Sequence, residues 1–293
     1  MTPLALTLVL VAATCHAAWN LVAKKAGGGN AFVLMGALLV GILWAPVVLW
    51  IGVQEVVNWG IAEWLVLAAS ALIHVLYFRM LLHGYMVSDL TVVYPVARGS
   101  GPLLSVVGAV LVLGETISMA GAAGALAVVI GVFLIAGGPG LWRQGHDSGQ
   151  RERVLRGIRW GALTGIFIAS YTVIDGYAVK VMLISPILVD YVGNILRIPI
   201  MLPVLLRDRA GFVQAWHAQW RAALIVAVLG PLSYVMVLYA MRMAPLSHVA
   251  PAREVSMLFA AIAGGTLLGE TDRWLRFVGA ASIAAGVAAL ALG

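Results

Sequence analysis

The chain has 293 residues, of which 62% are hydrophobic and only 10% are charged, whereas soluble domains carry about 25% charged residues. Its mean hydropathy of +1.02 excludes an ordinary soluble domain and predicts an all-α integral membrane protein. A formal net charge of +6 could suit nucleic acid, but the basic residues are dispersed and many lie at the ends of apolar runs. We therefore expect a lipid bilayer around this chain and no nucleic-acid partner.

Ten apolar runs are long enough to cross a bilayer as helices of about 20 residues. The first run lacks the basic segment of a signal peptide, so we expect it to be a transmembrane helix. Spans and short connections leave no room for a soluble catalytic domain. In chain order the predicted spans are Pro3–Ala23, Ala31–Val53, Trp64–Leu82, Leu90–Leu113, Ile117–Ala136, Trp160–Val179, Ile187–Leu206, Ala222–Met241, His248–Leu268 and Trp274–Leu292.

The two halves of the chain repeat at one fixed spacing, which is the signature of an internal duplication. Every matched pair is 155 residues apart (253 − 98). Five predicted spans in each copy force the second copy to enter the membrane from the opposite side, so we predict an inverted repeat, as in many secondary transporters. The matches are Lys25 with Lys180, Ala97-Arg98 with Ala252-Arg253, and Leu113-Gly114-Glu115-Thr116 with Leu268-Gly269-Glu270-Thr271.

The repeat and the polar composition around residue 150 divide the chain into parts. We predict a first five-helix repeat at 1–140, a polar linker at 141–157 and a second five-helix repeat at 158–293. Most Lys and Arg residues fall on the linker side of the predicted bundle, which by the positive-inside rule places the linker in the cytoplasm and both termini outside.

Small residues recur at the spacing of close helix packing, as in Gly157, Gly161 and Gly165. Packing within the chain is the first interpretation of these faces. A homodimer interface is the alternative.

Charged residues inside predicted spans are the first candidates for function, because an ionisable group in hydrocarbon is costly. Arg98 and Arg253 each follow a proline by a few residues, and proline disturbs a helix locally. We expect both arginines at a central cavity, where guanidinium groups can hold a carboxylate or phosphonate bidentately. The alternative is that Arg253 pairs with Glu254 or another acid and locks the halves together.

Asp175 is the best candidate for proton coupling, because it lies on one helix face with Tyr171 in an apolar span. Glu254 is the second candidate. A stripe of Asp190, Asn194 and Arg197 on the next span is interpreted as a stabilising network.

Other polar and aromatic residues could line the cavity. The histidines could instead be hydrogen-bonded between helices, and the aromatic side chains could anchor the membrane interface. The substrate-binding candidates beside the two arginines are Tyr94, His16, Trp19, Asn20, His74, Tyr77, Tyr171 and Tyr234. Glu115 and Glu270 are interpreted as helix-end residues.

The sequence contains no motif for a metal, a nucleotide or a cofactor. Cys15 is the only cysteine, which excludes a multi-cysteine metal site. We therefore expect no cofactor, no metal and no enzymatic activity. Without a nucleotide site, we expect transport to be coupled to an ion gradient or to proceed by solute exchange.

The doubled Leu-Gly-Glu segments, the fused halves and the ten spans resemble the EamA-type members of the drug/metabolite transporter superfamily. His16-Ala-Ala-Trp19-Asn20, Tyr94-Pro-Val-Ala-Arg98-Gly and Ala-Pro251-Ala-Arg253-Glu254 are similar to a subgroup of these proteins. The resemblance implies a multi-pass protein of the inner membrane that moves amino acids and other small metabolites through a central cavity. It also implies both termini in the cytoplasm, against the count of basic residues, so orientation stays open.

Together these features predict a secondary transporter, an exporter of small polar metabolites such as amino acids or related carboxylates and phosphonates. Alternating access around the cavity would be coupled to protons. The alternative within the same superfamily is a flippase for polyprenyl-phosphate lipid carriers.

Overall fold

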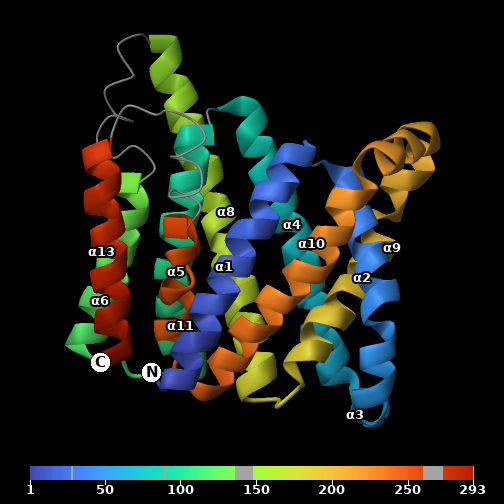
Figure 1. Cartoon of the computed structure of the whole chain (residues 1–293), viewed down its shortest axis with the longest axis horizontal. Helices are drawn as coiled ribbons and strands as arrows, with labels where there is room; N and C mark the ends of the chain where they lie inside the picture. The colour runs from blue at the N-terminus through green and yellow to red at the C-terminus, as the bar shows by residue number, and fades with distance from the viewer. Residues whose placement is uncertain (28, 89, 136–147, 260–272, 293) are drawn as a thin grey trace.

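The computed structural model describes residues 1–27, 29–88, 90–135, 148–259 and 273–292, and it shows a bundle of helices (Figure 1). No strand is assigned within these ranges. The helices are α1 (Pro3–Ala26), α2 (Asn30–Ile51), α3 (Val53–Val57), α4 (Ile61–Val87), α5 (Leu90–Leu113), α6 (Met119–Ile135), α8 (Ser148–Lys180), α9 (Pro186–Arg207), α10 (Arg209–Met243), α11 (Leu246–Ala252) and α13 (Arg273–Leu292).

Seven of the described helices, α1, α2, α4, α5, α8, α9 and α10, are long and apolar enough to cross a membrane. Two shorter apolar helices, Met119–Ile135 and Phe277–Leu292, accompany them. The all-α, multi-pass membrane architecture is therefore confirmed, whereas the count of ten spans stays a prediction.

The predicted span His248–Leu268 is not one continuous helix. Helix α11 ends at Ala252, Arg253 and Glu254 form a turn, and residues 255–259 are helical again. Residues 260–272, with Glu270, lie outside the described residues. An interruption thus falls at the residues that were expected to carry function.

Several helices begin before the predicted boundaries. Helix α8 starts at Ser148, so residues 148–157, which we assigned to the linker, continue that helix. Helix α10 starts at Arg209 rather than Ala222. The predictions followed hydropathy, and a helical turn that projects beyond the apolar layer carries polar residues.

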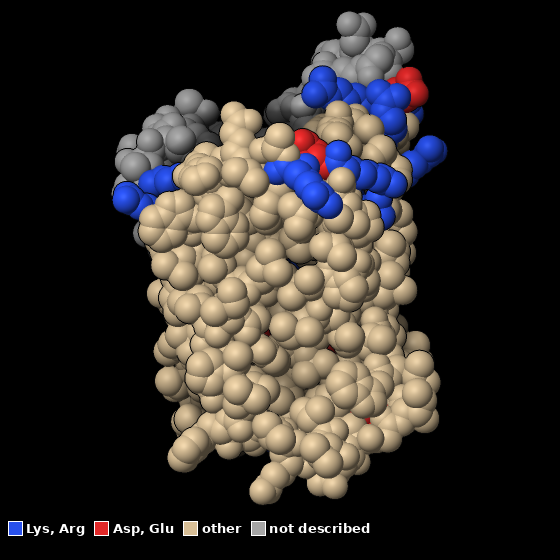
Figure 2. All heavy atoms as spheres, turned by 90° about the vertical axis from the view of Figure 1, so that its right-hand side faces the viewer, with Lys and Arg blue, Asp and Glu red and all other residues tan. Residues whose placement is uncertain are grey.

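The bundle has two chemically different ends. Lys and Arg side chains gather at one end, which we call the basic end, as Figure 2 shows for one face. It contains the end of α1, the start of α8 and the junction of α9 with α10 (Figure 1). Both chain termini lie at the opposite, terminal end (Figure 1), where the Met1 ammonium group donates to the carbonyl of Ala291 at 2.8 Å.

Helix α8 packs on α5 through the predicted glycine face. A Cβ atom at Gly161 would lie 2.8 Å from the carbonyl oxygen of Val93, and Cβ atoms at Gly157 and Gly165 would clash with the side-chain oxygens of Ser88, just before α5, and of Ser100. These glycines therefore serve close packing within the chain, which is the first of the two interpretations.

Helices α6 and α13 pack antiparallel through four glycines that contact one another reciprocally. A Cβ atom at Gly124 would lie 2.8 Å from the carbonyl oxygen of Gly286, and one at Gly286 would lie 2.6 Å from that of Gly124. Gly131 and Gly279 repeat this relation at 2.6 and 2.8 Å. Close backbone approach at these four glycines therefore holds α6 against α13.

Replacing Gly131 by valine should lower the thermal midpoint of the protein in detergent. The new side chain would meet the carbonyl oxygen of Gly279 and Cγ1 of Ile283, both at 2.6 Å from its Cβ atom, and overpacking of this kind costs about 1–3 kcal/mol. Gly230→Val is the matched control, because no atom lies within 4 Å of a Cβ at Gly230. Equal midpoints for the two variants would contradict close packing of α6 on α13.

Candidate functional site

The predicted site residues lie on α1, α4, α5, α8 and α10 and on the turn that follows α11. Together with Ser70 they form two adjoining groups. The arginine network consists of His16, Trp19, Asn20, Tyr94, Arg98, Arg253 and Glu254. The aspartate network consists of Ser70, His74, Tyr77, Tyr171, Asp175 and Tyr234.

The arginine network is centred on one buried carboxylate. Oε1 of Glu254 lies 3.5 Å from Nη1 of Arg98 and 3.8 Å from Nε of Arg253, and Glu254 is only 1% exposed. The two arginines that match in the sequence repeat therefore meet at the same oxygen atom. Because Glu254 also contacts Arg253, the structure contains the Arg253–Glu254 pair that was the alternative interpretation.

The backbone behaves differently around the two arginines. Helix α5 stays continuous through Pro95 and Pro102, so the expected disturbance near Arg98 is wrong. Near Arg253 the expectation holds, because α11 ends one residue after Pro251. The amide of Glu254 turns back to donate to the carbonyl of Pro251 at 2.9 Å, which places Arg253 and Glu254 side by side in the turn.

Helix α1 and Tyr94 complete the surroundings of Arg98. Nη2 of Arg98 lies 3.1 Å from Nε2 of His16, and its guanidinium carbon lies 5.5 Å from the centre of the Tyr94 ring. Because arginine only donates, Nε2 of His16 accepts and the ring proton lies on Nδ1. Trp19 contacts the His16 ring edge-on at 4.8 Å, and the Asn20 amide donates to the His16 carbonyl at 2.7 Å.

The aspartate network holds Asp175 in a fully buried position, 1% exposed. The Ser70 hydroxyl donates to Oδ1 at 2.5 Å, the Tyr234 hydroxyl donates to Oδ2, and Nε2 of His74 lies 4.0 Å from Oδ2. Three helices, α4, α8 and α10, thus converge on one carboxyl group. Ser70 was not predicted, because an uncharged serine in a span gives no sequence signal of its partner.

Aromatic rings join the aspartate network to the arginine network. The His74 ring stacks on Tyr171 at 4.0 Å, and the Tyr77 ring meets Tyr171 at 5.7 Å. Ala97, the neighbour of Arg98, belongs to the same buried cluster as Tyr171 and packs with Tyr77 and Tyr234. Residues on α4, α5, α8 and α10 therefore pack together in one cluster.

Helix α9 adds further charge on the predicted stripe. Asp190 is 6% exposed, the Asn194 amide donates to its carbonyl at 2.9 Å, and Nη1 of Arg197 donates to Oδ1 of Asn194 at 3.4 Å. No direct ion pair between Asp190 and Arg197 is recorded among the described residues.

Arg253 carries hydrogen-bond donors that no described residue satisfies. Its Nε and Nη2 atoms have no hydrogen-bond partner there, although the residue is only 5% exposed. Oε2 of Glu254 is unpaired in the same way. An unsatisfied charged donor in the protein interior is strongly unfavourable, so this guanidinium is suited to an anionic ligand.

A second charged contact lies at the terminal end, after α5. The Glu115 carboxylate accepts from Nζ of Lys180 at 2.6 Å and from the amides of Leu246 and Ser247 at 2.7 and 2.9 Å. Burial alone raises the pKa of Glu115, but Lys180 and the two amides outweigh it, so its pKa lies below the usual value. The stabilisation is therefore present at neutral pH and is lost as the pH falls through the folded-state pKa.

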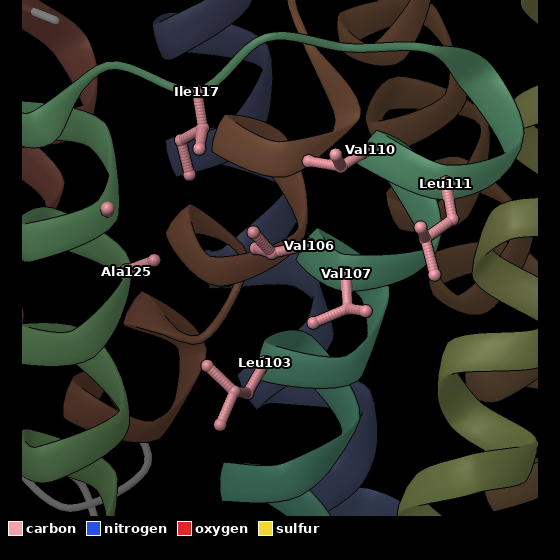
Figure 3. Close-up of a pocket in the computed structure, with 8 residues that line it drawn as sticks. Leu103, Val106, Val107, Val110, Leu111, Ile117 and Ala125 are labelled. Atoms are coloured by element: carbon pink, nitrogen blue, oxygen red, sulfur yellow. The ribbon is translucent and has the colours of Figure 1, made fainter.

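An apolar groove opens on the outer surface between α5 and α6 (Figure 3). Its volume is about 290 Å³. None of its lining residues belongs to either network. They are Leu103, Val106, Val107, Val110, Leu111, Ile117, Ala122 and Ala125.

Comparison with known proteins agrees with this architecture. Residues 155–292 match the model of the EamA-like transporter family. A crystal structure of another protein has the same fold, with a TM-score of 0.75 and 15% identity over 99% of this chain and 97% of that one; among curated proteins, none matches the sequence. The chain is therefore a multi-pass membrane protein whose residues 155–292 are similar to the EamA-like transporter family, in line with its resemblance to EamA-type members of the drug/metabolite transporter superfamily.

Proposed function

We propose that the protein is a secondary transporter that exports small polar metabolites bearing a carboxylate or phosphonate, such as amino acids. The unpaired Nε and Nη2 atoms of buried Arg253 carry this proposal. A carboxylate or phosphonate oxygen supplies the negative charge and lone pairs that would pair these donors. Arg98 lies nearby, because it contacts the same glutamate, Glu254. The solute would bind between the arginine and aspartate networks.

Alternating access about an inverted repeat is the proposed transport mechanism. The Ser282 hydroxyl donates to the carbonyl of Ala127 at 2.7 Å, and these residues are separated by 155 positions, the repeat spacing. Residues that match in the repeat touch one another only close to the axis that relates the halves. This contact and the reciprocal glycines of α6 and α13 support a two-fold axis in the membrane plane.

The charge distribution supports an orientation in the inner membrane. Lys and Arg side chains gather at the basic end (Figure 2), and such residues favour the cytoplasmic side. We place the basic end in the cytoplasm and both termini on the outer side.

Proteoliposome counterflow with a panel of amino acids, carboxylates and phosphonates tests the proposed function. We expect at least one class to exchange, and the Arg98→Ala, Arg253→Ala double variant to lose on the order of 100-fold in kcat/KM, as for loss of a buried charge contact. Arg242→Ala is the control, because Arg242 is exposed near the end of α10. Undiminished exchange by the double variant would exclude this site.

The apolar groove between α5 and α6 favours a second candidate, the lipid-carrier flippase. Its lining is open to the membrane, since Leu111 is 78% exposed, and a polyprenyl chain fits such a surface. Val107→Trp should fill the groove. Loss of polyprenyl-phosphate translocation in this variant with intact solute counterflow would support the flippase. Loss of solute counterflow with intact polyprenyl-phosphate translocation would support the solute transporter.

A further inference from the structure

Helix α11 and the turn after it concentrate buried polar atoms without partners. Within the described residues, the Ser247 hydroxyl and Nδ1 of His248 lack hydrogen bonds, as do the atoms of Arg253 and Glu254 described above. All four residues are at most 5% exposed. Buried polar groups are normally paired. A short segment with several unpaired groups is suited to pairing them in another arrangement or with a ligand.

The start of α11 is held by a defined contact, which we call the lock. Glu115 accepts from the first two amides of α11 and from Lys180, and Lys180 also donates to the carbonyl of Ala244 at 3.1 Å. The lock therefore ties the connection after α5, the end of α8 and the connection before α11 into one unit. Helices α5 and α8 run from the basic end to the terminal end (Figure 1), so the lock, formed where they end, lies at the terminal end.

An apolar layer lies between the lock and the networks. Leu246 is 0% exposed and packs so closely on Gly176, the residue after Asp175, that a Cβ atom there would clash with it. Val249 and Ala250 are also 0% exposed, whereas the Arg98 side chain is 12% exposed. Among the described residues, these α11 side chains are therefore fully enclosed, whereas the Arg98 side chain keeps partial exposure.

Helix α11 begins at the lock and ends at the arginine network. Leu246 and Ser247 begin the helix at the lock, and Arg253 follows its last residue in the arginine network. Seven helical residues span about 10 Å. The helix is bounded on both sides by non-helical residues, 244–245 before it and 253–254 after it.

We propose that α11 is a lever that couples solute binding at Arg253 to release of the Glu115–Lys180 lock, which closes the terminal end. This inference rests on the proposed transport function. An anion that engages Arg253 changes the contacts of the turn, and the rigid helix transmits that change to its first amides. Opening the lock then moves Leu246 away from Gly176 and exposes the site to the outer side.

Thiol labelling measures opening of the lock without any transported solute. The single native cysteine is removed by Cys15→Ser, and Ser247→Cys, at a position that is 0% exposed, reports access of a membrane-impermeant maleimide in the purified full chain. We expect Glu115→Gln to raise the labelling rate about tenfold, because a charge-assisted contact with Lys180 and the amides is weakened. Lys180→Met should raise it less, since the amide contacts remain.

Glu55→Gln is the matched control. The Glu55 carboxylate accepts from the amide of Ser185 at 2.7 Å before the start of α9, and its loss should leave labelling at residue 247 unchanged. Unchanged labelling in both Glu115→Gln and Lys180→Met would overturn the lock. The second variant keeps the test decisive if the first does not fold.

A double-mutant cycle between Glu115→Gln and Arg253→Gln tests the lever. Sites about 10 Å apart that share no partner normally act additively, whereas a rigid helix makes their effects on labelling non-additive. Additive effects, within about twofold, would overturn the lever. Absence of counterflow for every solute would instead reject the transport function without changing the labelling result.

Discussion

Asp175→Asn should abolish accumulation of the solute against its gradient and leave counterflow exchange close to that of the unaltered protein. Asparagine keeps the shape of the side chain and an oxygen that accepts from Ser70 or Tyr234. It cannot take up and release a proton, so only the step that uses the proton gradient is lost. The measurement is uptake into proteoliposomes with an imposed pH gradient, beside exchange with equal solute on both sides.

Asp208→Asn is the matched acid-to-amide control for this experiment. Asp208 is exposed and caps α10 through the amide of Gly211 at 2.8 Å, outside both networks. Equal loss of accumulation and exchange in Asp175→Asn would make Asp175 a structural or solute-binding residue and would remove it from the coupling mechanism.

Glu254→Gln should cause a large loss of stability, on the order of 3–5 kcal/mol. The variant leaves buried Arg253 and partly buried Arg98 beside each other without the carboxylate that both approach, at 3.8 and 3.5 Å. Adding Arg98→Met removes one of these charges and should restore part of the loss. Thermal unfolding in detergent measures both effects.

The control for this prediction is Glu152→Gln, which breaks the exposed pair with Arg156 at 2.9 Å and should change stability by less than about 0.5 kcal/mol. A Glu254→Gln variant as stable as Glu152→Gln would show that Glu254 does not neutralise the arginines. A double variant less stable than Glu254→Gln would show that Arg98 contributes mainly by packing.

Hydropathy predicted the described helices well where an apolar run fills the membrane, as for Leu90–Leu113, which is α5 residue for residue. It failed where a helix continues into polar residues or is too short to give a hydropathy signal. The first turns of α8 and α10 are polar because they project beyond the apolar layer, and the short helix α3 (Val53–Val57) adds too few residues for a signal.

The candidate site could be predicted as a set of residues but not as a set of contacts. Charges in apolar spans identified Arg98, Asp175, Arg253 and Glu254, because burial of a charge needs a compensating partner. The partners themselves depend on helix rotation and depth. No spacing in the sequence predicts that His16 contacts Arg98 at 3.1 Å or that Ser70 contacts Asp175 at 2.5 Å.

The embedded charges also determine how membrane voltage acts on the proposed cycle. Arg98, Arg197 and Arg253 are opposed by Asp175, Asp190 and Glu254, so the empty site is neutral when all of them are ionised. A bound monoanion adds one negative charge, and a proton on Asp175 cancels it. Since one unbalanced charge gains or loses about 2.3 kcal/mol per 100 mV, movement of a monoanion together with a proton would be electroneutral, whereas export of a monoanion in exchange for a proton would move two charges and respond to the membrane voltage.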